Sequence, residues 1–374
     1  GWIVGVGWIV GSATISAASI SPVAGNAEVQ ADTRVVISTN QAILLLYFCI
    51  CEFSGQHQLK HIHGYRCINN MFFFVQNAFS YPRDGARGKI IYNNKMERKL
   101  ILCNTLVCLD STDTIYNEGY LIIHDNRIVD IGFQKDISAH VPFDAVINLG
   151  NRLVMPGLVN THTHSPMTLF RGHVEGHTLF TLEGWYNTIR VLELKMTPDM
   201  LPPAVDVSCA EMIRTGTTCF VDQYFWMDQV VPQVRKSGMR SVLAYGIVEL
   251  GEEKARKREL AAAEAFLSSL EDDPLLTGWV GPHAFFVDNS VAAMEMEKAL
   301  SDKFDAGFHT HFGTGDSENN HCQETYGHSA LTQLNEMGFL EYPIIAAHSI
   351  TIPPDDFKLL VNKPFTVAAA PSSG

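Results

Sequence analysis

The feature that most constrains the fold is an alternation of strand-like and helix-like segments that begins at Leu158 and continues along the rest of the chain. The strand-like segments are short apolar runs, and seven of them can be counted, at 158–164, 219–222, 240–248, 277–286, 308–312, 344–347 and 365–370. Helix-like patterns separate them, at 198–214, 229–236, 254–270, 291–300, 325–337 and 354–361. Because strands that alternate with helices favour a parallel sheet, the sequence predicts an α/β fold of the (β/α)8 TIM-barrel type, truncated before its eighth strand.

The sequence divides into three parts, of which the barrel at 158–374 is the last. Residues 98–157 contain short strand patterns joined by turn residues such as Asp125-Asn126, and they predict a small partial β-sandwich. Residues 1–96 show no such regularity and are left unassigned. Their apolar opening lacks the basic start of a signal peptide, and the apolar run at 43–53 is too short to span a membrane.

Charge and cysteine content exclude several classes of protein. The chain carries 27 basic and 40 acidic residues, a net charge of −13, and contains no basic block. We therefore expect neither nucleic acid nor a membrane as a partner. The eight cysteines show no repeated metal-binding spacing, so we expect free thiols and a cytoplasmic location.

Histidines stand at the carboxyl ends of three of the predicted strands. His162 and His164 are two residues apart, so their side chains share one face of the first strand. His309 and His311 end the fifth strand, and His348 ends the sixth. These ends meet at one mouth of a barrel, where barrel enzymes carry their active sites. Imidazoles grouped there predict a site for a divalent metal ion.

The same segments resemble the metal-dependent amidohydrolase superfamily, in the branch of adenosine-, S-adenosylhomocysteine- and guanine-type deaminases and triazine chlorohydrolases. The resemblance covers about three-quarters of the chain. Its motifs are VMPGLVNTHTH at 154–164, continued by PM at 166–167 and LFRG at 169–172, then EMIRTGTT at 211–218 with Asp222, GPHA at 281–284 and AAH at 346–348. It implies a barrel with a composite β-sandwich built from both ends of the chain.

The resemblance also implies a set of site residues. One metal ion, most often zinc and in some members iron, would be bound by His162, His164 and His311. The segment 277–286 contains no lysine to bridge a second ion, which favours a mononuclear site. His348 would act in acid–base catalysis, whereas the substrate would be contacted by Glu193 and His283, with Trp185 shaping the pocket. For Trp185, packing in the core is an equal alternative.

The family's proton-transferring glutamate, three residues after the fifth-strand histidine, is replaced here by Thr314. Asp316 and Glu318 follow closely, and a loop shift could bring one of them into its place, with Glu318 as the expected substitute. The alternative is proton transfer through water and His348, or an impaired protein. The family's metal-binding aspartate at the end of the eighth strand has no counterpart in this sequence.

The resemblance implies hydrolytic deamination of a purine-like or other N-heterocyclic amidine by a metal-bound hydroxide. The alternatives are a chlorohydrolase acting on a triazine-like ring, a catalytically impaired truncated homologue, and a histidine-rich protein that only stores metal. The expected partner is a small N-heterocyclic substrate, and relatives suggest a homo-oligomer.

Overall fold

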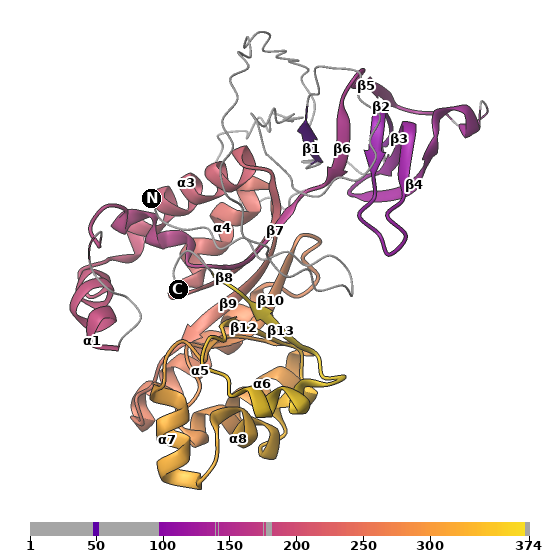
Figure 1. Cartoon of the computed structure of the whole chain (residues 1–374). Coiled ribbons are helices and arrows are strands. Elements are labelled where there is room, and N and C mark those ends of the chain that lie inside the picture. Colours follow the sequence, from indigo (N-terminus) through magenta and orange to yellow (C-terminus); the bar gives the residue numbers. More distant parts are fainter. Residues whose placement is uncertain are drawn as a thin grey trace. The chain divides into compact units, whose positions relative to one another are not determined.

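The computed structural model describes residues 48–51, 97–138, 140, 142–174, 176 and 182–370. The chain forms two compact units whose boundary lies between Gly157 and Leu158 (Figure 1). Among the described residues, no helix is both long and apolar enough to cross a membrane.

The first unit is built on one sheet with the strand order β1-β6-β2-β3-β4, and β5 pairs with β2 beside this path. Its strands are β1 (Phe48–Cys51), β2 (Arg98–Val107), β3 (Ile115–His124), β4 (Arg127–Phe133), β5 (Ala145–Asn148) and β6 (Leu153–Pro156). Alternate residues of β2 and β3 pack on opposite faces, with Ile101 and Leu121 on one and Leu100 and Tyr120 on the other. Residues 48–51 of the unassigned segment form β1, which pairs antiparallel with β6.

The second unit is a sheet of seven parallel strands in the order β13-β12-β11-β10-β9-β8-β7, so each strand lies beside its neighbour in sequence. The strands are β7 (Leu158–Thr163), β8 (Thr217–Tyr224), β9 (Arg240–Ile247), β10 (Leu276–Pro282), β11 (Phe308–Phe312), β12 (Ile344–His348) and β13 (Phe365–Ala368). The predicted parallel β/α barrel is therefore confirmed, and within the described ranges β7 and β13 form its two edges.

Helices connect these strands (Figure 1). The longer ones are α3 (Leu201–Arg214), α4 (Met227–Ser237), α5 (Glu253–Ser269), α6 (Val291–Phe304), α7 (Ser317–Tyr326) and α8 (Ala330–Glu336). Two short helices, α1 (Leu182–Trp185) and α2 (Val191–Glu193), flank a π-helical turn between β7 and α3. Each long helix buries apolar residues on one face, as α4 does with Val230, Val231 and Val234.

Two predicted helices differ from those observed. The prediction of a single helix at 325–337 is wrong. Gly327 adopts a left-handed φ of 81° and ends α7. Ser329 then caps α8, because its side chain accepts a hydrogen bond from the Thr332 backbone N–H. The segment expected to be helical at 354–361 forms a 3₁₀ helix over Pro354–Leu360. The apolar spacing of the sequence located both segments, but it could show neither the break between α7 and α8 nor the 3₁₀ form of the second segment.

Helix α6 buries a carboxyl group without an ionic partner. Glu297 is fully buried, and its Oε1 accepts a hydrogen bond of 2.8 Å from the Asn289 side-chain amide. The second carboxyl oxygen of Glu297 and the Asn289 Oδ1 are also buried and have no hydrogen-bond partner among the described residues. Burial raises the pKa of Glu297 well above its ordinary value, so the folded chain favours the neutral form of this carboxyl more strongly than the unfolded chain does.

Replacing Glu297 by glutamine should flatten the pH dependence of stability. Between its ordinary pKa and its raised pKa in the folded chain, Glu297 has lost its proton in the unfolded chain but keeps it in the folded one, so stability falls as pH rises through this window. Glu297→Gln cannot ionise, and its amide can donate to Asn289. We expect the melting temperature of the variant, followed by circular dichroism, to exceed that of wild type more at pH 8 than at pH 5.

The control is Glu295→Gln, which changes an exposed carboxylate of the same helix. Equal pH slopes for Glu297→Gln and wild type would show that Glu297 ionises freely in the folded chain.

Candidate metal centre

Five histidine side chains from three strands gather at the carboxyl edge of the barrel sheet. They are His162 and His164 from the end of β7, His309 and His311 from β11, and His348 from β12. The ring of His162 lies at centroid distances of 4.7 to 5.5 Å from the other four. The grouping follows from the sheet order, because β11 and β12 are parallel neighbours with Phe312 in register with His348.

Two of these rings have their tautomers set by backbone carbonyls. His164 Nδ1 lies 2.7 Å from the Gln223 carbonyl oxygen, and His311 Nδ1 lies 2.8 Å from that of His283. Since a carbonyl oxygen can only accept, each ring donates through Nδ1–H and carries a lone pair on Nε2. The two Nε2 atoms are 3.0 Å apart.

A cation fits between these two nitrogens. Burial lowers the pKa of His164 to about 3 and that of His311 well below its ordinary value, so neither ring readily takes up a second proton. Two lone pairs so close repel unless they share a cation. Zn²⁺ binds imidazole nitrogen at about 2.0–2.1 Å, which places two ligands of one ion about 3–3.5 Å apart. The donor set therefore suits a divalent metal ion.

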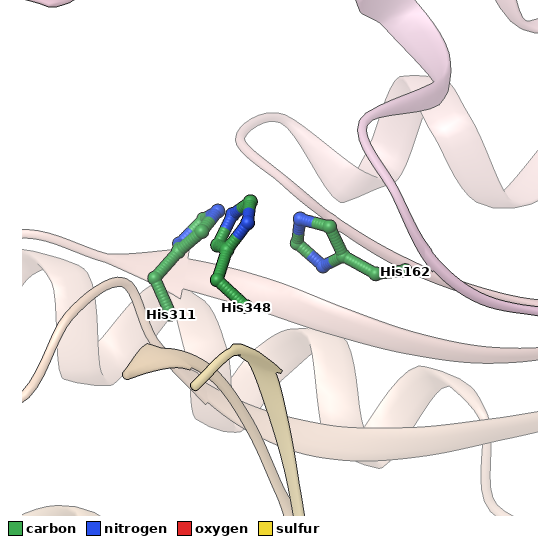
Figure 2. A group of neighbouring side chains, drawn as sticks. All are labelled: His162, His311 and His348. Carbon is green, nitrogen blue, oxygen red and sulfur yellow. The ribbon is translucent and has the colours of Figure 1, made fainter. Parts of the chain in front are cut away.

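Two sets of three histidines could complete the centre. The predicted set is His162, His164 and His311. In the described structure the three histidines that each place one ring nitrogen within 4.8 Å of the other two are instead His162, His311 and His348 (Figure 2). In Figure 2 the rings of His311 and His348 lie next to each other, and the ring of His162 lies across from both. Hydrogen bonding distinguishes His348, because its Nδ1 is buried without a partner in the described structure, whereas the Nδ1 atoms of the predicted three are all bonded.

A buried carboxylate organises the chain immediately after β7. Asp222, at the carboxyl end of β8, accepts hydrogen bonds from the Ser165 backbone N–H at 2.7 Å, the Ser165 hydroxyl at 2.5 Å and the Thr163 hydroxyl at 2.8 Å. Burial raises the pKa of Asp222 to about 6, and these hydrogen bonds oppose the shift. Because Thr163 and Ser165 flank His164, Asp222 holds the backbone that aims this ring.

The predicted substrate-binding residues lie beside the histidine cluster. The His283 ring is 4.7 Å from that of His311 and 5.6 Å from the indole of Trp185, between centroids. Trp185 is partly exposed, and its indole also contacts the ring of Tyr186. Glu193 is buried, which raises the pKa of its carboxyl group, while the nearby His283 and Arg190 lower it.

A hydrogen bond to Asp288 fixes the ring of His283. His283 Nδ1 lies 2.5 Å from one Asp288 oxygen, and the Ala284 backbone N–H donates to the other at 3.0 Å. Burial lowers the pKa of His283, but the charges of Asp288 and Glu193 and the hydrogen bond to Asp288 together outweigh burial, so the pKa lies above its ordinary value. Asp288 could not be singled out from the sequence, because its spacing from His283 matches no metal or catalytic pattern.

Thr314 and Glu318 lie in the segment that follows β11. The Thr314 hydroxyl is buried and has no partner among the described residues. Glu318 is buried in α7, where it accepts a hydrogen bond from the Gly313 backbone N–H, and burial raises the pKa of its carboxyl group to about 8. Within the described chain it makes no hydrogen bond to the histidines, so its contact with the centre is through Gly313, two residues after His311.

The chain is similar to known proteins over more than half of its length. Residues 153–371 match the Amidohydrolase family. The chain is 34% identical over 257 residues to a 5'-deoxyadenosine deaminase of Methanocaldococcus jannaschii, covering 68% of this chain and 60% of that protein. It is also 34% identical over 267 residues to a 5-methylthioadenosine/S-adenosylhomocysteine deaminase of Halothermothrix orenii, covering 71% and 61%. The chain thus spans about three-fifths of the length of these relatives.

A solved structure shares the fold. The crystal structure of an adenosine deaminase from Xanthomonas campestris with bound zinc superposes with a TM-score of 0.65 at 26% identity. The match covers 72% of this chain and 61% of that one.

Removing the Asp222 carboxylate should destabilise the barrel. In Asp222→Ala the Ser165 N–H and two hydroxyl groups lose a buried acceptor, so we expect the free energy of unfolding to fall by about 3 kcal/mol. Denaturant unfolding, followed by tryptophan fluorescence, measures the change. Asp228→Ala, at an exposed position in the first turn of α4, is the matched control. An unchanged midpoint for Asp222→Ala would mean that water replaces the carboxylate at no cost.

Proposed function

Because this chain belongs to the amidohydrolase family, we propose that it is a metal-dependent hydrolase of non-peptide carbon–nitrogen bonds that deaminates 5'-modified adenosines. The observation that carries the proposal is the 3.0 Å distance between the Nε2 atoms of His164 and His311, each of which carries a lone pair. The names of the two relatives supply the substrate class, an adenosine altered at its 5' position.

His162, His164 and His311 would hold the ion, each through Nε2. Zinc is the proposed ion, with iron as the alternative, since imidazole suits both. When bound, such an ion lowers the pKa of water toward about 7 and so provides hydroxide at neutral pH. Three neutral imidazoles leave the charge of the ion uncompensated, which favours this chemistry.

His348 and Glu318 are the proposed proton carriers. Deamination requires one group to take a proton from the attacking water and one to deliver a proton to the departing amine nitrogen. The unpaired Nδ1 of His348 leaves that ring free to take either part. Burial raises the pKa of the Glu318 carboxyl group to about 8, near neutral pH. Glu318 would take the place of the glutamate that Thr314 replaces.

Glu193, His283 and Trp185 would bind the nucleoside. With Nδ1 of His283 held by Asp288, its Nε2–H can donate to a ring nitrogen of the base. The carboxylate of Glu193 can accept from sugar hydroxyls, and the indole of Trp185 offers a flat apolar surface to the base. A cytoplasmic location and a homo-oligomeric state stay predictions.

The test combines metal content with product detection. We expect purified chain to hold one equivalent of zinc or iron by elemental analysis, and His162→Ala to lose it. We expect 5'-deoxyadenosine to be converted with release of ammonia, measured by a coupled assay. Chloride release from a chlorotriazine without deamination would favour the chlorohydrolase alternative. Metal without turnover of either substrate would indicate a catalytically impaired homologue, and metal retained in His162→Ala would contradict the proposed centre.

A further prediction separates the role of Glu318 in proton transfer from its support of Gly313. If Glu318 is the base, kcat rises with pH toward about 8, where the carboxyl group ionises. Glu318→Gln can still accept from Gly313 N–H but cannot carry a proton, so kcat should fall about 100-fold or more with KM little changed.

The control for Glu318→Gln is Glu324→Gln, at an exposed position of the same helix. A Glu318→Gln enzyme that keeps the wild-type pH–rate profile would remove Glu318 from the mechanism.

A further inference from the structure

His309 makes two hydrogen bonds that together determine where its proton lies. Its Nδ1 is 3.1 Å from the carbonyl oxygen of Ile345, and its Nε2 is 3.0 Å from Nδ1 of His162. The carbonyl oxygen can only accept, so Nδ1 of His309 carries the hydrogen and Nε2 carries a lone pair. Nδ1 of His162 must then donate to it, which leaves the lone pair of His162 on Nε2.

We propose that His309 is a positioning residue of the metal centre, which keeps His162 in the tautomer that presents Nε2 to the ion. The series runs from the Ile345 carbonyl through His309 to His162, and each step is a hydrogen bond between buried or partly buried groups. It performs for His162 what the Gln223 and His283 carbonyls perform for His164 and His311. Hydrogen bonds of this kind orient metal-bound histidines and raise their basicity.

The surroundings of His309 are built to hold it in place. The residue is fully buried, and its ring stands on β11 beside the neighbouring strand β12, which supplies Ile345 in direct register. Its own carbonyl oxygen accepts a hydrogen bond of 2.8 Å from the side-chain amide of Gln223, which also donates to the Pro282 carbonyl at 3.0 Å. Gln223 thereby joins β8 to β10 and β11 beneath the centre.

A histidine that served only to fill the core would be replaceable by an apolar ring. The position instead uses both ring nitrogens, one toward the strand and one toward His162. The inference rests on the proposed metal centre but is independent of the proposed substrate.

The experiment measures metal affinity, using the full chain stripped of metal and titrated with Zn²⁺ against a chromophoric chelator. His309→Phe keeps an aromatic ring but cannot accept from His162. We expect its affinity for Zn²⁺ to fall about 10–100-fold. His309→Gln places an amide oxygen where Nε2 stood, so it should restore most of the affinity although it lacks the ring that bonds Ile345.

The controls separate the possible failures. Phe308→Leu alters a buried residue of the same strand and should leave the affinity for Zn²⁺ unchanged. Loss of affinity to the same extent in His309→Phe and His309→Gln would mean that His309 only braces the strand, and unchanged affinity in both would also overturn the inference. If His162→Ala binds Zn²⁺ as wild type does, the metal centre itself is misassigned.

A measurement on the unmodified chain avoids any folding defect in the variants. In chain labelled with ¹⁵N-histidine and loaded with Zn²⁺, a long-range ¹H–¹⁵N spectrum reports which ring nitrogen carries hydrogen. We expect protonated Nδ1 and unprotonated Nε2 for both His309 and His162. A His162 ring protonated at Nε2 would overturn the proposal.

Discussion

The metal centre depends on backbone carbonyl oxygens that decide which nitrogen of each imidazole carries its hydrogen. A carbonyl can accept but never donate, so a ring bonded to it through Nδ1 must turn a lone pair outward on Nε2. His164 and His311 meet in this way, with Nε2 atoms 3.0 Å apart. Without these acceptors the same rings could rotate or change tautomer, and their lone pairs would not converge.

The parallel sheet supplies those acceptors as well as the rings. Gln223 lies on β8 and His283 directly follows β10, so each ring is bonded to a strand other than its own. A slip of one residue in register would turn every side chain of a strand to the other face. The positions of the histidine rings are therefore fixed by the pairing of the strands. At the end of β7 the carboxylate of Asp222 also fixes the backbone, by accepting hydrogen bonds from Thr163 and Ser165.

The buried carboxylates of Asp222 and Asp288 bond to residues next to the proposed ligands and not to the ligand rings. Burial lowers the pKa of His162, His164, His309 and His311, which keeps these rings neutral and able to offer lone pairs. Asp288 bonds His283 and Asp222 bonds the backbone, so neither carboxylate is available as a ligand. The three histidines proposed as ligands would therefore bind an ion as neutral imidazoles.

Several features were open to prediction, and others were not, for physical reasons. Apolar runs separated by helical patterns indicated seven parallel strands, because each strand is buried on both faces and each helix on one. The break between α7 and α8 was missed because a left-handed glycine leaves the hydrophobic spacing unchanged. Strand β1 was missed because its partner β6 lies about a hundred residues along the chain, and pairing at that distance leaves no local signal.

By itself the sequence determined the alternation of strands and helices and the places of the histidines at the ends of three strands, since both follow from local spacing. It also carried the family motifs around His162 and His348. Only the tertiary structure decided which nitrogen of each ring carries a lone pair. It also decided that His309 is hydrogen-bonded to His162, and Asp288 to His283. Those assignments depend on hydrogen bonds between different strands and loops, and such bonds exist only once the chain has folded.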